Sequence, residues 1–201
     1  IGALTDGLDI HSYTASLMFN LEYTPDFKKV HGDLRQIAKP IGFGLMYGMG
    51  PVGLANRISI ETGKPVTKEE GQGYMDKYFA SYPSVQKFLE KMGKDAVKNG
   101  WSTTPAGRKR WYVKPEQNDP DYRKKVSGIQ RQAKNHPIQG TNADAIKYAL
   151  VFLYERMKKE GIEGGIILTV HDEVVCEVRE DQAKDWAKIQ AEEMVRAGEL
   201  F

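Results

Sequence analysis

Helical patterns of apolar and polar residues occupy most of the first half of the chain. Residues that favour helix ends border these patterns. Asp9 and Asp33 are predicted N-caps, because their side chains can accept hydrogen bonds from the first backbone N–H groups of a helix. Thr67 begins a predicted capping box, and Gly100 is a favoured helix stop. The predicted helices cover residues 10–19, 34–47, 67–79 and 83–100.

The second half combines helical patterns with short stretches of strand pattern. Between residues 101 and 113, Thr, aromatic and basic residues around Pro105 predict a short hairpin or an irregular basic loop. A helical pattern follows this stretch, and Pro137 is expected to interrupt it, because proline lacks a backbone N–H. The predicted helices here cover residues 120–135, 139–159 and 180–200.

Near Asp172, charged residues break an apolar run. Residues 166–170 and 174–178 are predicted strands of a buried hairpin, with Asp172 and Glu173 at its tip. Burying a carboxylate is costly unless a cation or hydrogen bonds meet it, so a divalent metal is one expectation. A solvated turn is the alternative, because Asp is common in two-residue hairpin turns.

The order of these elements predicts a helix-rich α+β fold, with an antiparallel β-hairpin flanked by helices. A chain of 201 residues can bury a substantial core, in one large domain or two small ones. Tyr78, Phe79 and Tyr82 are expected in that core. A dinucleotide site at the glycine pattern of residues 48–53 is not favoured, because this pattern follows a helix and contains Pro51.

Charge is unevenly distributed along the chain. Residues 101–135 contain nine Lys or Arg and three Asp or Glu, a net charge of +6. Residues 155–201 contain seven basic and twelve acidic residues, a net charge of −5. A basic middle favours a surface that faces a polyanion, and an acidic end is typical of metal-binding or solvated carboxylates. Solvated helix faces alone are the open alternative.

Composition argues against several classes of protein. Cys176 is the single cysteine, which excludes an internal disulfide and agrees with a reducing compartment. No apolar stretch approaches the ~20 residues of a membrane span, and the N-terminus lacks a signal-peptide pattern, so no membrane partner is expected. Because the chain starts without Met and stops within a helical pattern, we expect it to be part of a larger protein.

The predicted helix at residues 34–47 carries an unusual row of side chains. Arg35, Lys39, Phe43 and Tyr47 follow one another at four-residue intervals and therefore share a helix face. Cations near a helix N-terminus can bind a triphosphate, and aromatic rings can contact a base and a sugar. An amphipathic surface helix with its cations extended over apolar neighbours is the alternative. Pro40 within the row predicts a kinked or easily reoriented helix.

This row resembles the fingers-helix motif of family A DNA polymerases, the bacterial DNA polymerase I type. Other segments resemble that family in the same order and cover nearly the whole chain: residues 9–15, 104–110, 131–144 and 170–173. The resemblance implies fingers helices plus part of a polymerase palm. It divides the chain into a palm-to-fingers segment at residues 1–30, the fingers at 31–115 and the C-terminal palm portion at 116–201.

The resemblance also implies a site for the incoming deoxynucleoside triphosphate. Arg35, Lys39 and His11 would bind its phosphates. Phe43 would lie by the sugar, and Tyr47 would lie near the template base. Lys39 is also the expected proton donor to the leaving pyrophosphate.

Primer-template DNA is the macromolecular partner that the resemblance implies. Its DNA-binding residues would be Arg108, Arg131, Asn135, Gln139 and His171. Contacts to the backbone and to minor-groove acceptors are similar for all correct base pairs, which suits binding that is independent of sequence.

The implied activity is that of a DNA-directed DNA polymerase in replication or repair. Asp172, with Glu173 as a lesser contributor, would coordinate two catalytic Mg²⁺ ions for phosphoryl transfer to a primer 3′-hydroxyl. The family takes a further Asp from a strand before the segment at Asp9. We therefore expect a missing N-terminal segment or a subunit to supply it, and this chain alone to polymerise poorly or not at all. A non-catalytic DNA-binding module is the alternative function, and a cytoplasmic, bacterial or phage-like setting is expected.

Overall fold

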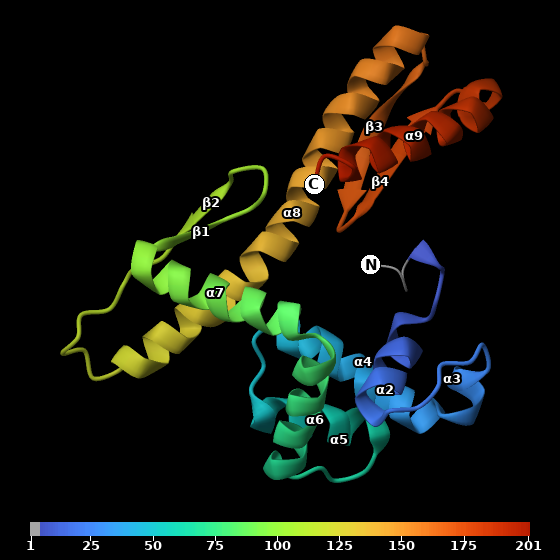
Figure 1. The fold of residues 1–201 in the computed structure, drawn as a ribbon. Helices are drawn as coiled ribbons and strands as arrows, with labels where there is room; N and C mark the ends of the chain where they lie inside the picture. The colour runs from blue at the N-terminus through green and yellow to red at the C-terminus, as the bar shows by residue number, and fades with distance from the viewer. Residues whose placement is uncertain (1–4) are drawn as a thin grey trace. The chain divides into compact units, whose positions relative to one another are not determined.

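The computed structural model describes residues 5–201 and divides the chain into two compact units (Figure 1). Unit 1 holds the described residues up to Trp101 together with Tyr112–Asn135, and unit 2 holds Ser102–Trp111 together with His136–Phe201. Helices dominate and the strands form small sheets, which confirms the helix-rich α+β class. Within residues 5–201, no helix combines the length and the apolar content that a membrane crossing requires. The predicted division at residues 30 and 115 stays a prediction.

Most helices of unit 1 pack around one apolar cluster. In chain order they are α2 (Ile10–Phe19), α3 (Phe27–Val30), α4 (Gly32–Met46), α5 (Pro51–Thr62), α6 (Lys68–Ser81) and α7 (Pro83–Asn99). The cluster draws Ala15 from α2, Ile41 from α4, Leu54 from α5 and Tyr78 from α6. Phe79 and Tyr82 pack against it, so the three aromatic side chains expected in the core are confirmed there.

Most predicted capping residues act as caps. The side chain of Asp9 accepts a hydrogen bond from the first turn of α2, and Thr67 forms the predicted capping box with Glu70. Gly100 ends α7 in the left-handed conformation, with φ 79°. The prediction for Asp33 is wrong, because α4 starts at Gly32 with His31 as its N-cap, and Asp33 lies inside the first turn. A carboxylate at that place still favours the helix, through the helix dipole.

The sequence patterns do not predict α5, although both of its ends carry a signal. Pro51 occupies the first turn of α5, and Gly63 ends the helix with φ 69°. Gly48 and Gly50 indicate a loop before Pro51, so the sequence pattern does not show that a helix starts there. Leu54 and Ile58 are fully buried, and α5 packs against α4 and α6. Tertiary packing therefore stabilises a helix that local preference leaves undecided.

Helix α8 (Tyr122–Glu160) runs without a break through Pro137. The predicted interruption at Pro137 is therefore wrong. In unit 1, Ala133 packs against Ala96 of α7, and in unit 2, Leu153 belongs to the core. Pro137 removes only one main-chain hydrogen bond from α8. Because the residues before and after it are packed, the helical backbone continues through Pro137.

The strands belong to two small sheets. In chain order they are β1 (Trp101–Thr103), β2 (Lys109–Trp111), β3 (Gly164–Val170) and β4 (Glu173–Val178). β1 pairs with β2, so the first of the two expected alternatives, a short hairpin, is confirmed. β3 and β4 pair antiparallel from Gly164 and Val178 to Val170 and Glu173. A 3-10 turn (Glu180–Gln182) leads into α9 (Ala183–Gly198), close to the last predicted helix.

Only one face of the β3–β4 hairpin is covered, so the expectation of a buried hairpin is wrong. Val174 is buried together with Leu153 of α8 and Trp186 of α9, and Figure 1 shows these elements together. Ile167 is 60% exposed, and the tip at residues 171–173 is exposed as well. Antiparallel sheets commonly face water on one side. The carboxylates at the tip therefore avoid the cost of burial.

Candidate functional site

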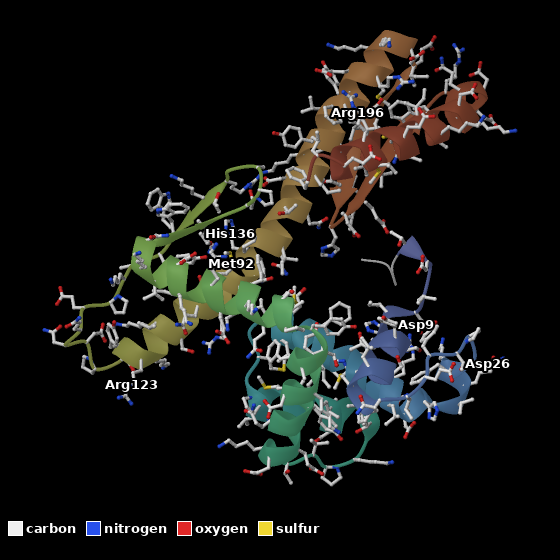
Figure 2. All side chains as sticks on the ribbon, in the orientation of Figure 1. Asp9, Asp26, Met92, Arg123, His136 and Arg196 are labelled. Atoms are coloured by element: carbon white, nitrogen blue, oxygen red, sulfur yellow. The ribbon has the colours of Figure 1, made fainter. Side chains whose placement is uncertain are left out.

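The first group of candidate residues lies where α2 meets α4. Asp9, at the start of α2 in Figure 2, accepts hydrogen bonds from the backbone N–H of His11 at 3.1 Å and from Nε of Arg35 at 2.7 Å. The side chains of Asp9 and Arg35 are 31% and 22% exposed. The pairing occupies Nε of the guanidinium. Its two terminal amino groups are the donors that an approaching anion would take.

The pair of Asp9 and Arg35 makes stability depend on pH. Burial raises the pKa of Asp9, but the hydrogen bonds from Arg35 and His11 outweigh burial and lower this pKa from 3.8 to about 2. A lowered pKa stabilises the fold above about pH 4, and this stabilisation is lost as the pH falls towards 2.

Asp9→Asn is therefore expected to lower the free energy of unfolding at pH 7 by about 1–2 kcal/mol, because Asn keeps the N-cap acceptor but loses the charge. The difference between the two proteins should shrink by about half at pH 3. Urea unfolding at both pH values measures it. A difference of equal size at pH 7 and pH 3 would contradict the assignment.

His11 and Phe43 also meet between α2 and α4. Their ring centroids are 5.6 Å apart, with the planes at 56°. Burial lowers the pKa of His11, and the charges of Arg35 and Lys39 lower it further against the opposing charge of Asp9, so the ring is neutral at pH 7. Lys39 and Phe43 are exposed. The structure thus gathers two cations, a neutral imidazole and an aromatic ring on one surface.

The residue after Tyr47, Gly48, lies against Arg131, which the sequence places in a different site. Tyr47 is the C-cap of α4 and is 49% exposed. The next residue, Gly48, has φ 73°, and a Cβ atom there would lie 2.9 Å from Cγ of Arg131 on α8. The left-handed backbone and the close approach both require glycine. The segment after Tyr47 therefore rests directly on the stem of Arg131.

Three predicted DNA-binding residues form a row on α8. Arg131, Asn135 and Gln139 follow one another at four-residue intervals and share a helix face. Arg131 and Gln139 are exposed, and Asn135 is half-buried. This face offers a cation and two amide groups, which can donate hydrogen bonds to phosphate oxygens or base edges.

Arg108, another predicted DNA contact, has an internal partner. Its Nε donates to Oδ1 of Asp144 on α8 at 2.7 Å, and one terminal amino group contacts the same oxygen. Thr104 donates to Oδ2 of Asp144 at 2.6 Å. Asp144 is only 4% exposed. Burial raises the pKa of Asp144, but these hydrogen bonds lower it below its ordinary value, so the carboxylate is ionised at neutral pH.

The tip of the β3–β4 hairpin places two carboxylates side by side. Val170 pairs with Glu173 across a two-residue turn of His171 and Asp172, with His171 at φ 54°. All of the tip side chains are exposed. Between residues 5 and 201, no three His, Cys, Asp or Glu side chains are placed to share one metal ion. Asp172 and Glu173 suit a hard cation that keeps several water ligands, and they supply only part of such a site.

Comparison with known proteins finds one family. The model of the family described as DNA polymerase family A matches residues 1–200. DNA polymerase I of Pseudomonas aeruginosa is 38% identical over 181 residues, which cover 90% of this chain and 18% of that protein. The thermostable DNA polymerase I of Thermus aquaticus is 36% identical over 198 residues, which cover 96% of this chain and 22% of that protein. The chain spans about a fifth of the length of these curated relatives.

A solved structure shares the fold. It is the POL domain of Pol1 from M. smegmatis in complex with DNA primer-template and dNTP. The TM-score is 0.79 at 32% sequence identity, and the match covers 98% of this chain and 32% of that one. The resemblance drawn from sequence motifs is confirmed by these comparisons.

Proposed function

The chain belongs to DNA polymerase family A, and on this premise we propose that it forms part of a template-directed DNA polymerase. The proposed reaction adds a deoxynucleoside triphosphate to a primer 3′-hydroxyl, as in replication or repair. The surface of α2 and α4 carries the proposal, because it combines Arg35, Lys39 and His11 with the ring of Phe43. A triphosphate requires concentrated positive charge, and a sugar or base is well matched by an aromatic ring.

In this proposal each side chain of the surface has one role. Arg35 binds the phosphates through its terminal amino groups, because Asp9 holds the guanidinium by Nε. Lys39 binds the phosphates and donates a proton to the departing pyrophosphate. Phe43 lies by the sugar, and Tyr47 lies near the template base. His11, neutral at pH 7, adds a hydrogen bond to a phosphate oxygen.

We propose Asp172 and Glu173 as ligands of Mg²⁺. They fit this ion, which prefers a few carboxylates together with phosphate oxygens and water, because both are exposed and adjacent. When bound, Mg²⁺ would activate the 3′-hydroxyl and neutralise the triphosphate. A two-metal centre needs more carboxylate than this turn contains, which a further segment or subunit of the polymerase would supply.

Primer-template DNA is the proposed partner. Arg131, Asn135 and Gln139 would bind it through the exposed face of α8, and His171 through the hairpin tip. Their groups suit minor-groove acceptors and phosphates, which are common to all base pairs. In the same proposal, residues 31–115 act as the fingers and residues 116–201 as part of the palm.

Primer extension by the complete gene product in Mg²⁺ tests the proposal. We expect incorporation that follows the template, and Arg35→Ala should raise KM for the deoxynucleoside triphosphate by about 10- to 100-fold, the worth of a hydrogen bond to a charged group. Arg57→Ala is the matched control, since Arg57 pairs with Glu61 on α5 and should leave KM unchanged. Tight DNA binding without any incorporation would contradict the proposal and support the alternative function, a non-catalytic DNA-binding module.

A further inference from the structure

The β1–β2 hairpin presents an aromatic ring among cations. Lys109, Arg110 and Trp111 are exposed, and the exposed fraction of Trp111 is 69%. Nζ of Lys109 lies 5.6 Å from the centroid of the indole ring. Proteins that bind single-stranded nucleic acid combine these two features, because bases stack on aromatic rings while cations follow the backbone.

The loop between β1 and β2 is closed by its own main chain. The N–H of Thr104 donates to the carbonyl of Arg108 at 3.0 Å, and the N–H of Gly107 donates to the carbonyl of Thr104 at 2.9 Å. Gly107 adopts φ 86°, a conformation that favours glycine. Lys109 and Arg110 therefore directly follow a turn of defined conformation.

Helix α8 anchors this loop at three points within unit 2. Asp144 binds Thr104 and Arg108 as described above. At Gly140 there is no room for a Cβ atom beside Cγ2 of Thr104. Oγ of Ser102 lies 2.8 Å from Nδ1 of His136, which Figure 2 places on α8 beside β1.

Asp144 holds the guanidinium of Arg108 at the base of this turn, and the three residues that follow Arg108 are exposed. We propose that Lys109, Arg110 and Trp111 form a contact surface for single-stranded DNA. Trp111 stacks on an unpaired base, and Lys109 and Arg110 bind the flanking phosphates. Arg108 and Asp144 are positioning residues that hold this surface. The inference rests on the proposed function, since a polymerase handles an unpaired template strand.

Fluorescence anisotropy of the complete gene product with two labelled strands tests this surface, without nucleotide or divalent ion. One strand is a 12-nucleotide oligothymidine, and the other is an abasic strand of the same length. We expect Trp111→Ala to weaken oligothymidine binding by about 5- to 50-fold and to leave abasic binding unchanged, because only bases stack. The double variant K109Q/R110Q should weaken both and reduce the slope of log affinity against log salt by about 1.4.

A second exposed pair of ring and cation on α8 provides the control. Nζ of Lys158 lies 4.3 Å from the ring centroid of Tyr154, which is 55% exposed. Tyr154→Ala and Lys158→Gln should leave both affinities unchanged. Asp144→Asn should reduce the preference for oligothymidine over the abasic strand, because Trp111 is no longer held in place, and loss of stability alone would weaken the binding of both strands equally. If it fails to fold, the Trp111→Ala and K109Q/R110Q variants still decide the outcome.

Two results would overturn the inference. One is equal weakening of both strands by Trp111→Ala, and the other is a loss with Tyr154→Ala as large as that with Trp111→Ala. The proposed polymerase activity fails in a different way. It fails when the complete gene product incorporates no nucleotide, whereas strand binding is measured here without nucleotide and can persist.

Discussion

Asp172→Asn should lower the turnover of the complete gene product in primer extension by about 10³-fold, or roughly 4 kcal/mol of transition-state stabilisation. Asn keeps the size and one acceptor oxygen of Asp but loses the negative charge that Mg²⁺ prefers. Asp172 lies exposed in a two-residue turn, so the substitution leaves the core of unit 2 intact. Single-turnover kinetics across a range of Mg²⁺ concentrations measure the loss.

Glu177→Gln is the matched control for this prediction, because Glu177 is an exposed carboxylate on β4 of the same hairpin. It should leave turnover unchanged, and thermal unfolding followed by circular dichroism should be the same for both variants. Glu173→Gln should cost less than Asp172→Asn. Wild-type turnover in Asp172→Asn would remove the hairpin from the proposed metal centre.

Helix ends that depend on neighbouring residues were predictable from the sequence. Asp9, Thr67 and Gly100 act through bonds to groups a few positions away, so their role does not depend on the rest of the fold. Asp33 shows the limit of this reasoning. A residue type that favours the N-cap also favours the first turn, and the sequence alone does not distinguish the two positions.

Features that depend on tertiary packing were not predictable in the same way. Pro137 normally indicates a helix break, but Ala133 and Leu153 are packed on either side of it and the helix continues. The apolar strands around Asp172 indicated a buried hairpin. Only contact with α8 and α9 shows that one face is covered and the other, with Ile167, is not.

The candidate site also has features that local spacing predicts and features that depend on tertiary packing. The row from Arg35 to Tyr47 follows from four-residue spacing, which a helix converts into one face. The pairing of Arg35 with Asp9 joins residues 26 positions apart, and that of Arg108 with Asp144 joins residues 36 apart. Neither pairing has a local signature. The apolar neighbours of Asp144, Ala143 and Ala145, are the only sign in the sequence that this carboxylate has a partner.

Lys39→Ala should lower turnover by about 10²- to 10⁴-fold, the range of general acid catalysis, through loss of the proton donor to the leaving pyrophosphate. Lys39 is exposed on α4, one turn after Arg35, where a departing phosphate group can reach it. The same substitution also removes a phosphate contact, so KM for the nucleotide should rise. Lys77→Ala on α6 is the control, because Lys77 is exposed over the ring of Phe19 in the same unit.

Lys39→Arg separates the two roles of the lysine. Arginine keeps the positive charge and the phosphate contact, but its guanidinium does not release a proton near neutral pH. KM should therefore return towards the wild-type value while kcat stays low, and steady-state kinetics at one fixed pH measure both. Undiminished turnover in Lys39→Arg would rule out proton donation and leave Lys39 as an electrostatic contact alone, with Arg35 as its neighbour on the same face of α4.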